Sequence, residues 1–205
     1  MSLDLLPALY IFVLVAIFTP GPNNMMLLAS GANFGLRRTV PHMLGITVGH
    51  SALVVILGLG LAQVFQTYPS VLTTLKFICL AYLLYLAWRI ANAAPPDAAQ
   101  ARGNPLTFLE AAAFQWVNPK AWAVALTAVT AYLPGTGTAA VALVAVVFIT
   151  VSLPSVSLWA GMGTAIRGWL AEADRLRAFN WTMAALLLLS TLLARTIATP
   201  LRRLS

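Results

Sequence analysis

Two short polar motifs interrupt apolar stretches of this chain, and the first is TPGPNN at residues 19–24. A proline removes a backbone donor and clashes with the carbonyl one turn earlier, so two prolines around a glycine are expected to break a helix. In a membrane, the carbonyls freed by such a break are tolerated only where protein or a water-filled cavity satisfies them. The motif therefore predicts an internal polar site, with a simple proline kink as the alternative. The residues expected to form the site are Pro20, Gly21, Pro22, Asn23 and Asn24.

The second motif is FQWVNPK at residues 114–120. Asn118 can cap a new helical segment, and Pro119 suits the first turn of that segment. Lys120 would then lie near the middle of an apolar span, where a charge costs about 3 kcal/mol on insertion scales. Such a lysine normally faces a cavity or a partner. The alternative is a span that begins later, from which Lys120 would extend to the membrane interface.

Together the two motifs predict a site for a small zwitterion. Helix N-termini present free amides and the positive end of the helix dipole, so they favour an anionic group. The amides of the interrupted helices and Lys120 would receive a carboxylate. The freed carbonyls and the asparagine side chains would receive an ammonium group.

The composition places these motifs inside a membrane. Of the 205 residues, 60% are hydrophobic and only 8% are charged, and the mean hydropathy is +0.88. Ordinary soluble domains carry about 25% charged residues, so lipid must cover most of the surface. The net charge of +7 comes from basic residues scattered between apolar spans, which is typical of cytoplasmic loops and does not indicate a nucleic-acid partner. The first apolar segment has no basic region before it, so we expect a retained helix.

The spacing of the charges predicts an all-α membrane protein with six transmembrane helices, since about 20 apolar residues cross the hydrocarbon core. The expected spans are residues 5–30, 41–64, 71–91, 107–132, 138–162 and 179–198. Under this assignment seven basic residues fall on one side and four on the other, so the first side is predicted to be cytoplasmic and both termini external. The seven are Arg37, Arg38, Arg89, Arg102, Arg167, Arg175 and Arg177.

The six spans form a single domain, residues 1–205, with two halves at residues 1–92 and 106–205 and a hydrophilic linker at 93–105. Three spans in each half give the two halves opposite orientations. The first span of each half is interrupted by proline and asparagine, as in transporters built from inverted repeats. We therefore expect a 3+3 inverted repeat in which helices 1 and 4 are broken.

The motifs also carry a family resemblance. The run FTPGPNNMMLLASGANFGLRRTVPHMLGITVGH resembles the first signature of the lysine-exporter (LysE/RhtB) family of amino-acid effluxers. LKFICLAYLLYLAWR is similar to the third helix of that family, and WVNPKAWAVALTA resembles its second-half signature. The resemblance implies six helices and export of small amino acids or their derivatives, driven by proton exchange.

One departure from the family pattern concerns proton coupling. Many relatives have an acidic residue in the second span, where this chain has His50 after Gly49. Histidine titrates near neutral pH, so His50 is a candidate proton carrier, and a histidine hydrogen-bonded to a neighbouring helix is an equal alternative. His42 follows Pro41 near a loop and is expected to be interfacial.

Other small and aromatic residues have weaker signals. The pairs Gly45–Gly49 and Ser157–Gly161 have the four-residue spacing that permits close helix packing. Tyr82 and Tyr85 are candidate cavity-lining residues, although their spacing suits core packing equally.

The sequence thus predicts a secondary-active exporter of a small, neutral amino acid or derivative, working by proton antiport as a multi-pass protein of the bacterial inner membrane. No zinc-protease or nucleotide-binding motif is present, so we expect neither an enzyme nor a metal or other cofactor. The expected partners are the amino acid, membrane lipid and, as a candidate homo-oligomer, further copies of the chain. The alternatives are a membrane scaffold or assembly protein and an exporter of a solute other than an amino acid.

Overall fold

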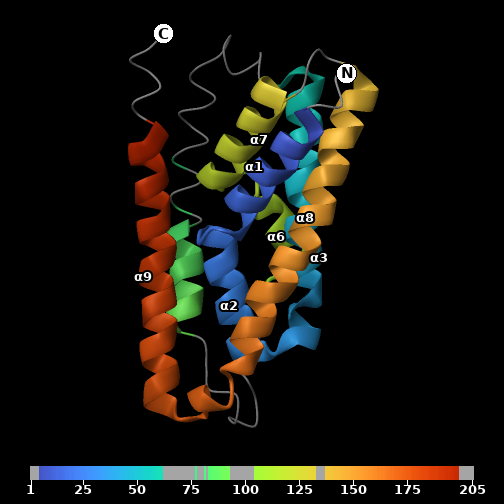
Figure 1. Cartoon of the computed structure of the whole chain (residues 1–205). Coiled ribbons are helices and arrows are strands. Elements are labelled where there is room, and N and C mark those ends of the chain that lie inside the picture. Colours follow the sequence, from blue (N-terminus) through green and yellow to red (C-terminus); the bar gives the residue numbers. More distant parts are fainter. Residues whose placement is uncertain are drawn as a thin grey trace.

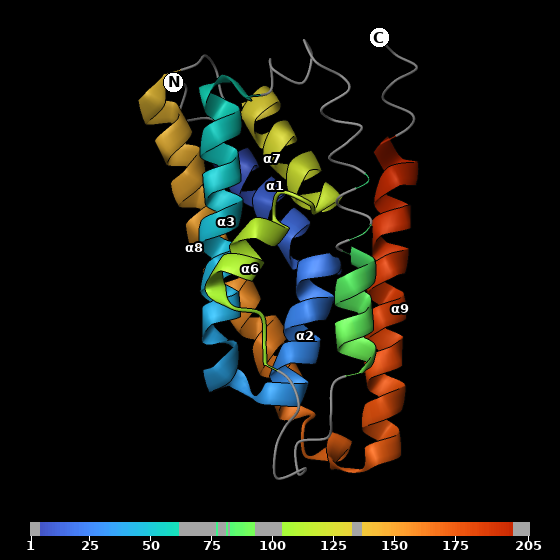
Figure 2. The same cartoon turned by 180° about the vertical axis from the view of Figure 1, so that it is seen from behind.

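The computed structural model describes residues 5–61, 77, 81, 83–92, 104–132 and 137–198, which form helices and turns and contain no strand (Figure 1). The predicted all-α fold is confirmed for this part of the chain. Residues 83–91 form a helix that lies beside the last one in both views (Figure 2). The other elements are α1 (Leu6–Phe18), α2 (Pro22–Phe34), α3 (Leu36–Ile56), the π-helical turn η2 (Leu57–Leu61), α6 (Phe108–Phe114), α7 (Pro119–Tyr132), α8 (Thr138–Ala165), the short turn η3 (Trp169–Ala171) and α9 (Ala173–Ala198).

The two prolines of the first motif separate α1 from α2. A residue before proline is driven to an extended conformation, and both Thr19 (φ −61°, ψ 137°) and Gly21 (φ −175°, ψ −179°) are extended. Helix α1 therefore ends at Phe18. Helix α2 begins at Pro22, where the missing N–H of proline costs nothing. The two helices meet at an angle of 53°, which confirms the predicted break in helix 1.

The second motif separates α6 from α7. A capping box begins α6, in which Glu110 N donates to Thr107 Oγ1 at 3.2 Å and Thr107 N donates to Glu110 Oε2 at 2.8 Å. Residues 115–117 form a turn, and α7 begins at Pro119. The predicted break in helix 4 is therefore confirmed. Along the bundle, α1 and α2 run in the opposite direction to α6 and α7 (Figure 1).

Two of the described helical segments, Leu36–Gly60 and Thr138–Ala165, are long and apolar enough to cross a membrane, and α1 with α2 makes a third if the bent pair is one span. The first of these begins before the predicted residue 41, because Gly35, with a φ of 79°, turns the chain directly from α2 into α3. Of the predicted span 71–91, the structure describes residues 77, 81 and 83–91.

Glycines bring the long helices against the broken ones. A Cβ at Gly45 or Gly49 would collide with the backbone of α6, so the close packing predicted for this pair is confirmed. The prediction for Ser157 and Gly161 is wrong for the described part of the chain, none of which lies within 4 Å of a Cβ at Gly161. Gly163 instead faces the backbone of α2. These contacts hold α3 against α6 and α8 against α2.

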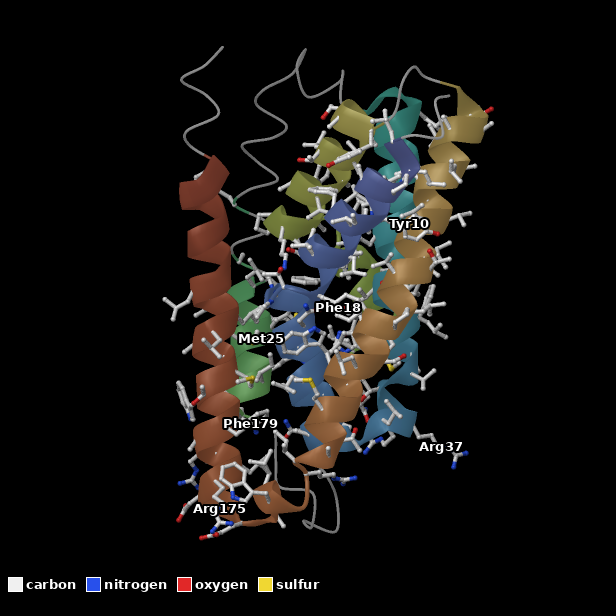
Figure 3. The ribbon with its side chains drawn as sticks, viewed as in Figure 1. Tyr10, Phe18, Met25, Arg37, Arg175 and Phe179 are labelled. Carbon is white, nitrogen blue, oxygen red and sulfur yellow. The ribbon has the colours of Figure 1, made fainter. Side chains whose placement is uncertain are left out.

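Basic residues gather at one end of the bundle. The start of α3, the end of α8 and the start of α9 lie together there, and Figure 3 shows Arg37 and Arg175 at that end. Both belong to the set predicted to be cytoplasmic. Arg102 and most basic residues predicted for the other side lie outside the described residues.

Candidate functional site

The break between α1 and α2 presents backbone acceptors midway along the bundle, where Figure 3 labels the flanking residues Phe18 and Met25. The side chain of Asn24 is buried and donates from Nδ2 to the carbonyl oxygens of Ile17 at 2.8 Å and Thr19 at 2.9 Å. Each carbonyl oxygen has two lone pairs, so these oxygens can accept further hydrogen bonds besides those from Asn24.

The break between α6 and α7 is closed by its own polar groups. Asn118 is buried, and its Oδ1 accepts a hydrogen bond from Lys120 N at 3.1 Å, which confirms the predicted cap. Gln115, also buried, exchanges two hydrogen bonds with Asn23 across the bundle: Asn23 Nδ2 to Gln115 Oε1 at 2.9 Å and Gln115 Nε2 to Asn23 Oδ1 at 3.1 Å. Sequence reasoning did not select Gln115, although it lies within the second motif.

Lys120 connects the second break to the first. Its Nζ donates to the carbonyl oxygens of Thr19 at 2.6 Å and Pro20 at 3.3 Å. The ammonium group therefore contacts the broken backbone and does not extend to an end of the bundle. Gly21 provides the space, because a Cβ there would lie 2.8 Å from Lys120 Cδ and 2.9 Å from Lys120 Nζ. The result is a charge-assisted contact, the stronger class of hydrogen bond.

These groups line one small cavity, whose volume of about 30 Å³ admits about two water molecules. His50 lines it too: the ring is buried, packs edge-on against Phe148 at 4.9 Å between centroids, and has no hydrogen-bond partner for Nε2 among the described residues. Among the described residues, none that lines the cavity carries a carboxylate. The predicted site residues that line this cavity are Gly21, Asn23, Asn24, His50, Asn118 and Lys120.

The remaining predicted residues lie elsewhere. Pro22 and Pro119 begin α2 and α7 and act on the backbone. Tyr85 does not line the cavity; its side chain is 46% exposed and faces outward because the opposite face of its helix packs into the core. Tyr82 lies outside the described residues.

His42, which the sequence predicts to be interfacial, is buried at 1% exposure and lines a cavity together with residues of α2 and the helix at 83–91. Within the described part of the chain, no three His, Cys, Asp or Glu side chains gather as metal ligands.

A comparison with protein families and a comparison with curated proteins both match this chain to transport proteins. The model of the LysE type translocator family matches residues 14–195. A cysteine/O-acetylserine efflux protein of Klebsiella pneumoniae is 28% identical over 190 residues, 91% of this chain and 95% of that protein. The protein of the same name in Escherichia coli K12 is 31% identical over 174 residues, 84% of this chain and 86% of that protein.

A third relative, the cysteine/O-acetylserine efflux protein of Salmonella typhimurium LT2, is 31% identical over 130 residues. That match covers 63% of this chain and 66% of the relative, just under two thirds of its length. No solved structure is significantly similar to the chain.

Proposed function

The chain belongs to the LysE type translocator family, and from that premise we propose that it is a secondary-active exporter of a small, neutral amino acid or derivative. Its membership confirms a membrane transport protein and not an enzyme. The relatives are named for efflux of cysteine and O-acetylserine. Both compounds are zwitterions with an uncharged side chain, which supports the proposed class of substrate.

The observation that carries this proposal is the position of the Lys120 ammonium on the carbonyl oxygens of Thr19 and Pro20. An acceptor pair that holds one primary ammonium group has the chemistry to hold another. The α-ammonium group of an amino acid would take these two carbonyls and displace Lys120. The released Lys120 would then bind the substrate carboxylate, together with the free amides at the start of α2.

The charges around the cavity support a neutral side chain. Of the described residues that line the cavity, none is Asp or Glu, so these residues would offer a cationic side chain no counter-ion. The cationic Lys120 would attract the carboxylate of an acidic side chain as well as the α-carboxylate, but the small volume disfavours a second charged group with its hydration shell. A short, uncharged side chain fits both constraints.

His50 is the proposed proton carrier. It is buried in the wall of the same cavity, and its unpartnered Nε2 can take up a proton. A proton on His50 would repel the nearby Lys120 ammonium and the substrate ammonium alike. Competition between substrate and proton for one cavity would give antiport. The alternative is a histidine whose ring serves only to pack against Phe148.

The proposed architecture is a multi-pass protein of the bacterial inner membrane with six spans in a 3+3 inverted repeat. The opposite directions of the two broken helices support it (Figure 1). We assign the two halves to residues 1–92 and 106–205 of a single domain. The basic end that carries Arg37 and Arg175 would face the cytoplasm, with both termini outside.

The test is efflux from proteoliposomes preloaded with labelled cysteine, O-acetylserine, alanine, lysine or glutamate, with and without an imposed pH gradient. We expect efflux of the three neutral compounds, faster with an inward proton gradient, and little efflux of lysine or glutamate. Strong lysine efflux would contradict the neutral class, and indifference to the pH gradient would contradict antiport. If folded protein transports none of the five, the alternatives remain a different solute or a scaffold.

A further inference from the structure

A second cavity lies toward the basic end of the bundle, between α2, α3, the helix at 83–91 and the segment that leads into α6. Figure 2 shows α2 between that segment and the helix at 83–91. The cavity shares no lining residue with the central one and is larger, about 60 Å³. Its α2 residues run from Met26 to Phe34, so at 1.5 Å per residue its middle lies about 12 Å along α2 from the first break.

His42 gives this cavity an unsatisfied polar group. The side chain is 1% exposed, and neither Nδ1 nor Nε2 has a hydrogen-bond partner among the described residues. A neutral imidazole carries one N–H donor and one acceptor nitrogen. Buried polar atoms in native proteins almost always have a partner. A ligand in the cavity that His42 lines would supply one.

Arg89 gives the same cavity a fixed cation. Its Nη1 donates to Glu110 Oε1 at 3.0 Å, and its Nη2 donates to Asn104 O at 3.0 Å. A guanidinium group has five N–H donors, so these two bonds orient Arg89 and leave further donors in the plane of the group. A planar guanidinium held in this way suits recognition of a carboxylate.

The rest of the wall is either apolar or already satisfied. Ser30 shares a hydrogen bond with Thr39 at 3.0 Å, and Asn33 donates to Asn180 Oδ1 at 2.8 Å, so these buried groups need no ligand. The apolar part of the wall consists of Met26, Leu86, Ile90 and Leu106. A mainly apolar pocket with a few convergent polar groups is the usual form of a small-molecule site.

We infer that this cavity is a second binding site for the transported amino acid, on the path between the basic end of the bundle and the central cavity. The substrate carboxylate binds Arg89, its ammonium donates to an unprotonated ring nitrogen of His42, and its side chain contacts the apolar wall. This inference rests on the proposed function, because it takes the exported zwitterion as the ligand. His42 here acts as a binding residue and has no part in the central site.

The experiment compares wild type with His42→Leu, His42→Gln and Thr47→Val. Leucine removes both ring nitrogens, glutamine restores a donor and an acceptor, and Thr47 is a buried polar residue of the same helix that lines neither cavity. The probe is labelled L-cysteine kept reduced. The readouts are binding stoichiometry on the purified chain, the KM and maximal rate of efflux from the side of the basic end, and the melting temperature.

We expect two cysteine molecules bound per wild-type chain and one per His42→Leu chain. The KM of His42→Leu is expected to rise about 10-fold, the effect of one lost hydrogen bond to a charged group, with a nearly unchanged maximal rate. His42→Gln is expected to stay within about twofold of wild type, because the glutamine side chain offers the same ammonium group another uncharged acceptor, and Thr47→Val is expected to keep the wild-type KM.

The inference is overturned if His42→Leu melts at a higher temperature than wild type and keeps its stoichiometry and KM. That result would show a buried histidine that merely lacks a partner. A wild-type chain that binds one cysteine and exports it overturns the second site and leaves the proposed function standing. A wild-type chain that neither binds nor exports any of the neutral amino acids overturns both.

Discussion

The two helix breaks lie side by side and differ in almost every chemical respect. Between α1 and α2 the backbone is fully extended at Thr19 and Gly21, and carbonyl oxygens are left for side chains to satisfy. Between α6 and α7 the chain stays wound, with turn hydrogen bonds from Gln115 N, Trp116 N and Val117 N to carbonyls three residues earlier, at 3.2, 3.1 and 3.0 Å. The first break therefore leaves backbone carbonyl oxygens available as acceptors, whereas the backbone of the second break is held in hydrogen-bonded turns.

The difference follows from the placement of proline. Two prolines separated by one residue force the residue before each of them, Thr19 and Gly21, to be extended, so the first motif cannot form a turn. A single proline preceded by asparagine only starts a new helix, because Asn118 caps it and Pro119 occupies its first position. The second break therefore keeps its backbone in a hydrogen-bonded turn and can offer a donor, the ammonium of Lys120, to the first. If the halves are inverted repeats, equivalent positions have acquired complementary chemistry.

The variant with the largest expected effect on this comparison removes the donor, the ammonium group of Lys120. We expect Lys120→Ala to reduce the initial rate of amino-acid efflux from proteoliposomes about 100-fold, because it removes the cation proposed to bind the substrate carboxylate, and a lost contact between two charged groups of about 3 kcal/mol corresponds to roughly 100-fold. Lys120→Arg keeps a cation and is expected to retain part of the rate. Wild-type efflux by folded Lys120→Ala would show that the first break does not depend on the second.

A smaller effect is expected when Lys120 is kept and the space that Gly21 leaves beside it is filled. In Gly21→Ala the new Cβ would lie 2.8 Å from Lys120 Cδ and 2.9 Å from Nζ, so the lysine must leave the carbonyls. The φ of −175° at Gly21 suits any residue, and backbone strain does not contribute. We expect about a 10-fold loss of efflux, because the methyl group fills part of the central cavity and moves the lysine proposed to bind the substrate carboxylate, weakening one charged hydrogen bond to the substrate.

Gly161→Ala is the matched control for that variant, because a Cβ at Gly161 meets nothing within 4 Å. It is expected to transport at the wild-type rate. The double variant Gly21→Ala/Lys120→Ala is expected to be no worse than Lys120→Ala alone, since both changes remove the same contact. Additive losses would mean that Gly21 acts independently of Lys120.

The sequence predicted the breaks because they depend on local chemistry. Pro20, Pro22, Asn118 and Pro119 act on their own neighbours along the chain, so helix ends could be assigned without knowing what packs against them. The choice of Lys120 as a residue that faces a cavity or a partner rested on the cost of a charge in lipid. Its actual acceptors, the carbonyls about 100 residues away in the chain, depend on how the helices pack.

What the sequence missed has the same origin. His42 follows a proline near a loop, and nothing local to it predicts that it is buried at 1% exposure and lines a cavity with residues of α2 and the helix at 83–91. Gly161 has the right spacing to Ser157, but the rotation of α8 directs Gly163 toward α2 instead. Helix rotation is set by the whole interface, and a pair of small residues does not determine it.

The amide pair that joins the two breaks provides the third test. Asn23 and Gln115 exchange hydrogen bonds of 2.9 and 3.1 Å. Removing Asn23 leaves Oε1 of the buried Gln115 without this partner, and removing Gln115 leaves the half-buried amide of Asn23 without it. We expect Asn23→Ala and Gln115→Ala each to reduce efflux about 5-fold, and the double variant to lose little more than either single variant. The measurement is a double-mutant cycle on efflux rate. Independent, multiplying losses would show that the pair does not couple the halves.

The smallest effect is expected from loosening the closed break. Trp122 Nε1 donates to Trp116 O at 2.8 Å, and the two rings pack edge to face at 6.1 Å between centroids. Trp122→Phe removes the hydrogen bond and keeps an aromatic ring, so a neutral bond worth about 1 kcal/mol is lost. We expect a reduction in efflux of about 2- to 5-fold, since 1 kcal/mol corresponds to roughly 5-fold in rate. A loss as large as that of Lys120→Ala would mean that the turn between α6 and α7 must itself stay wound for transport, and that the second break does more than carry the lysine.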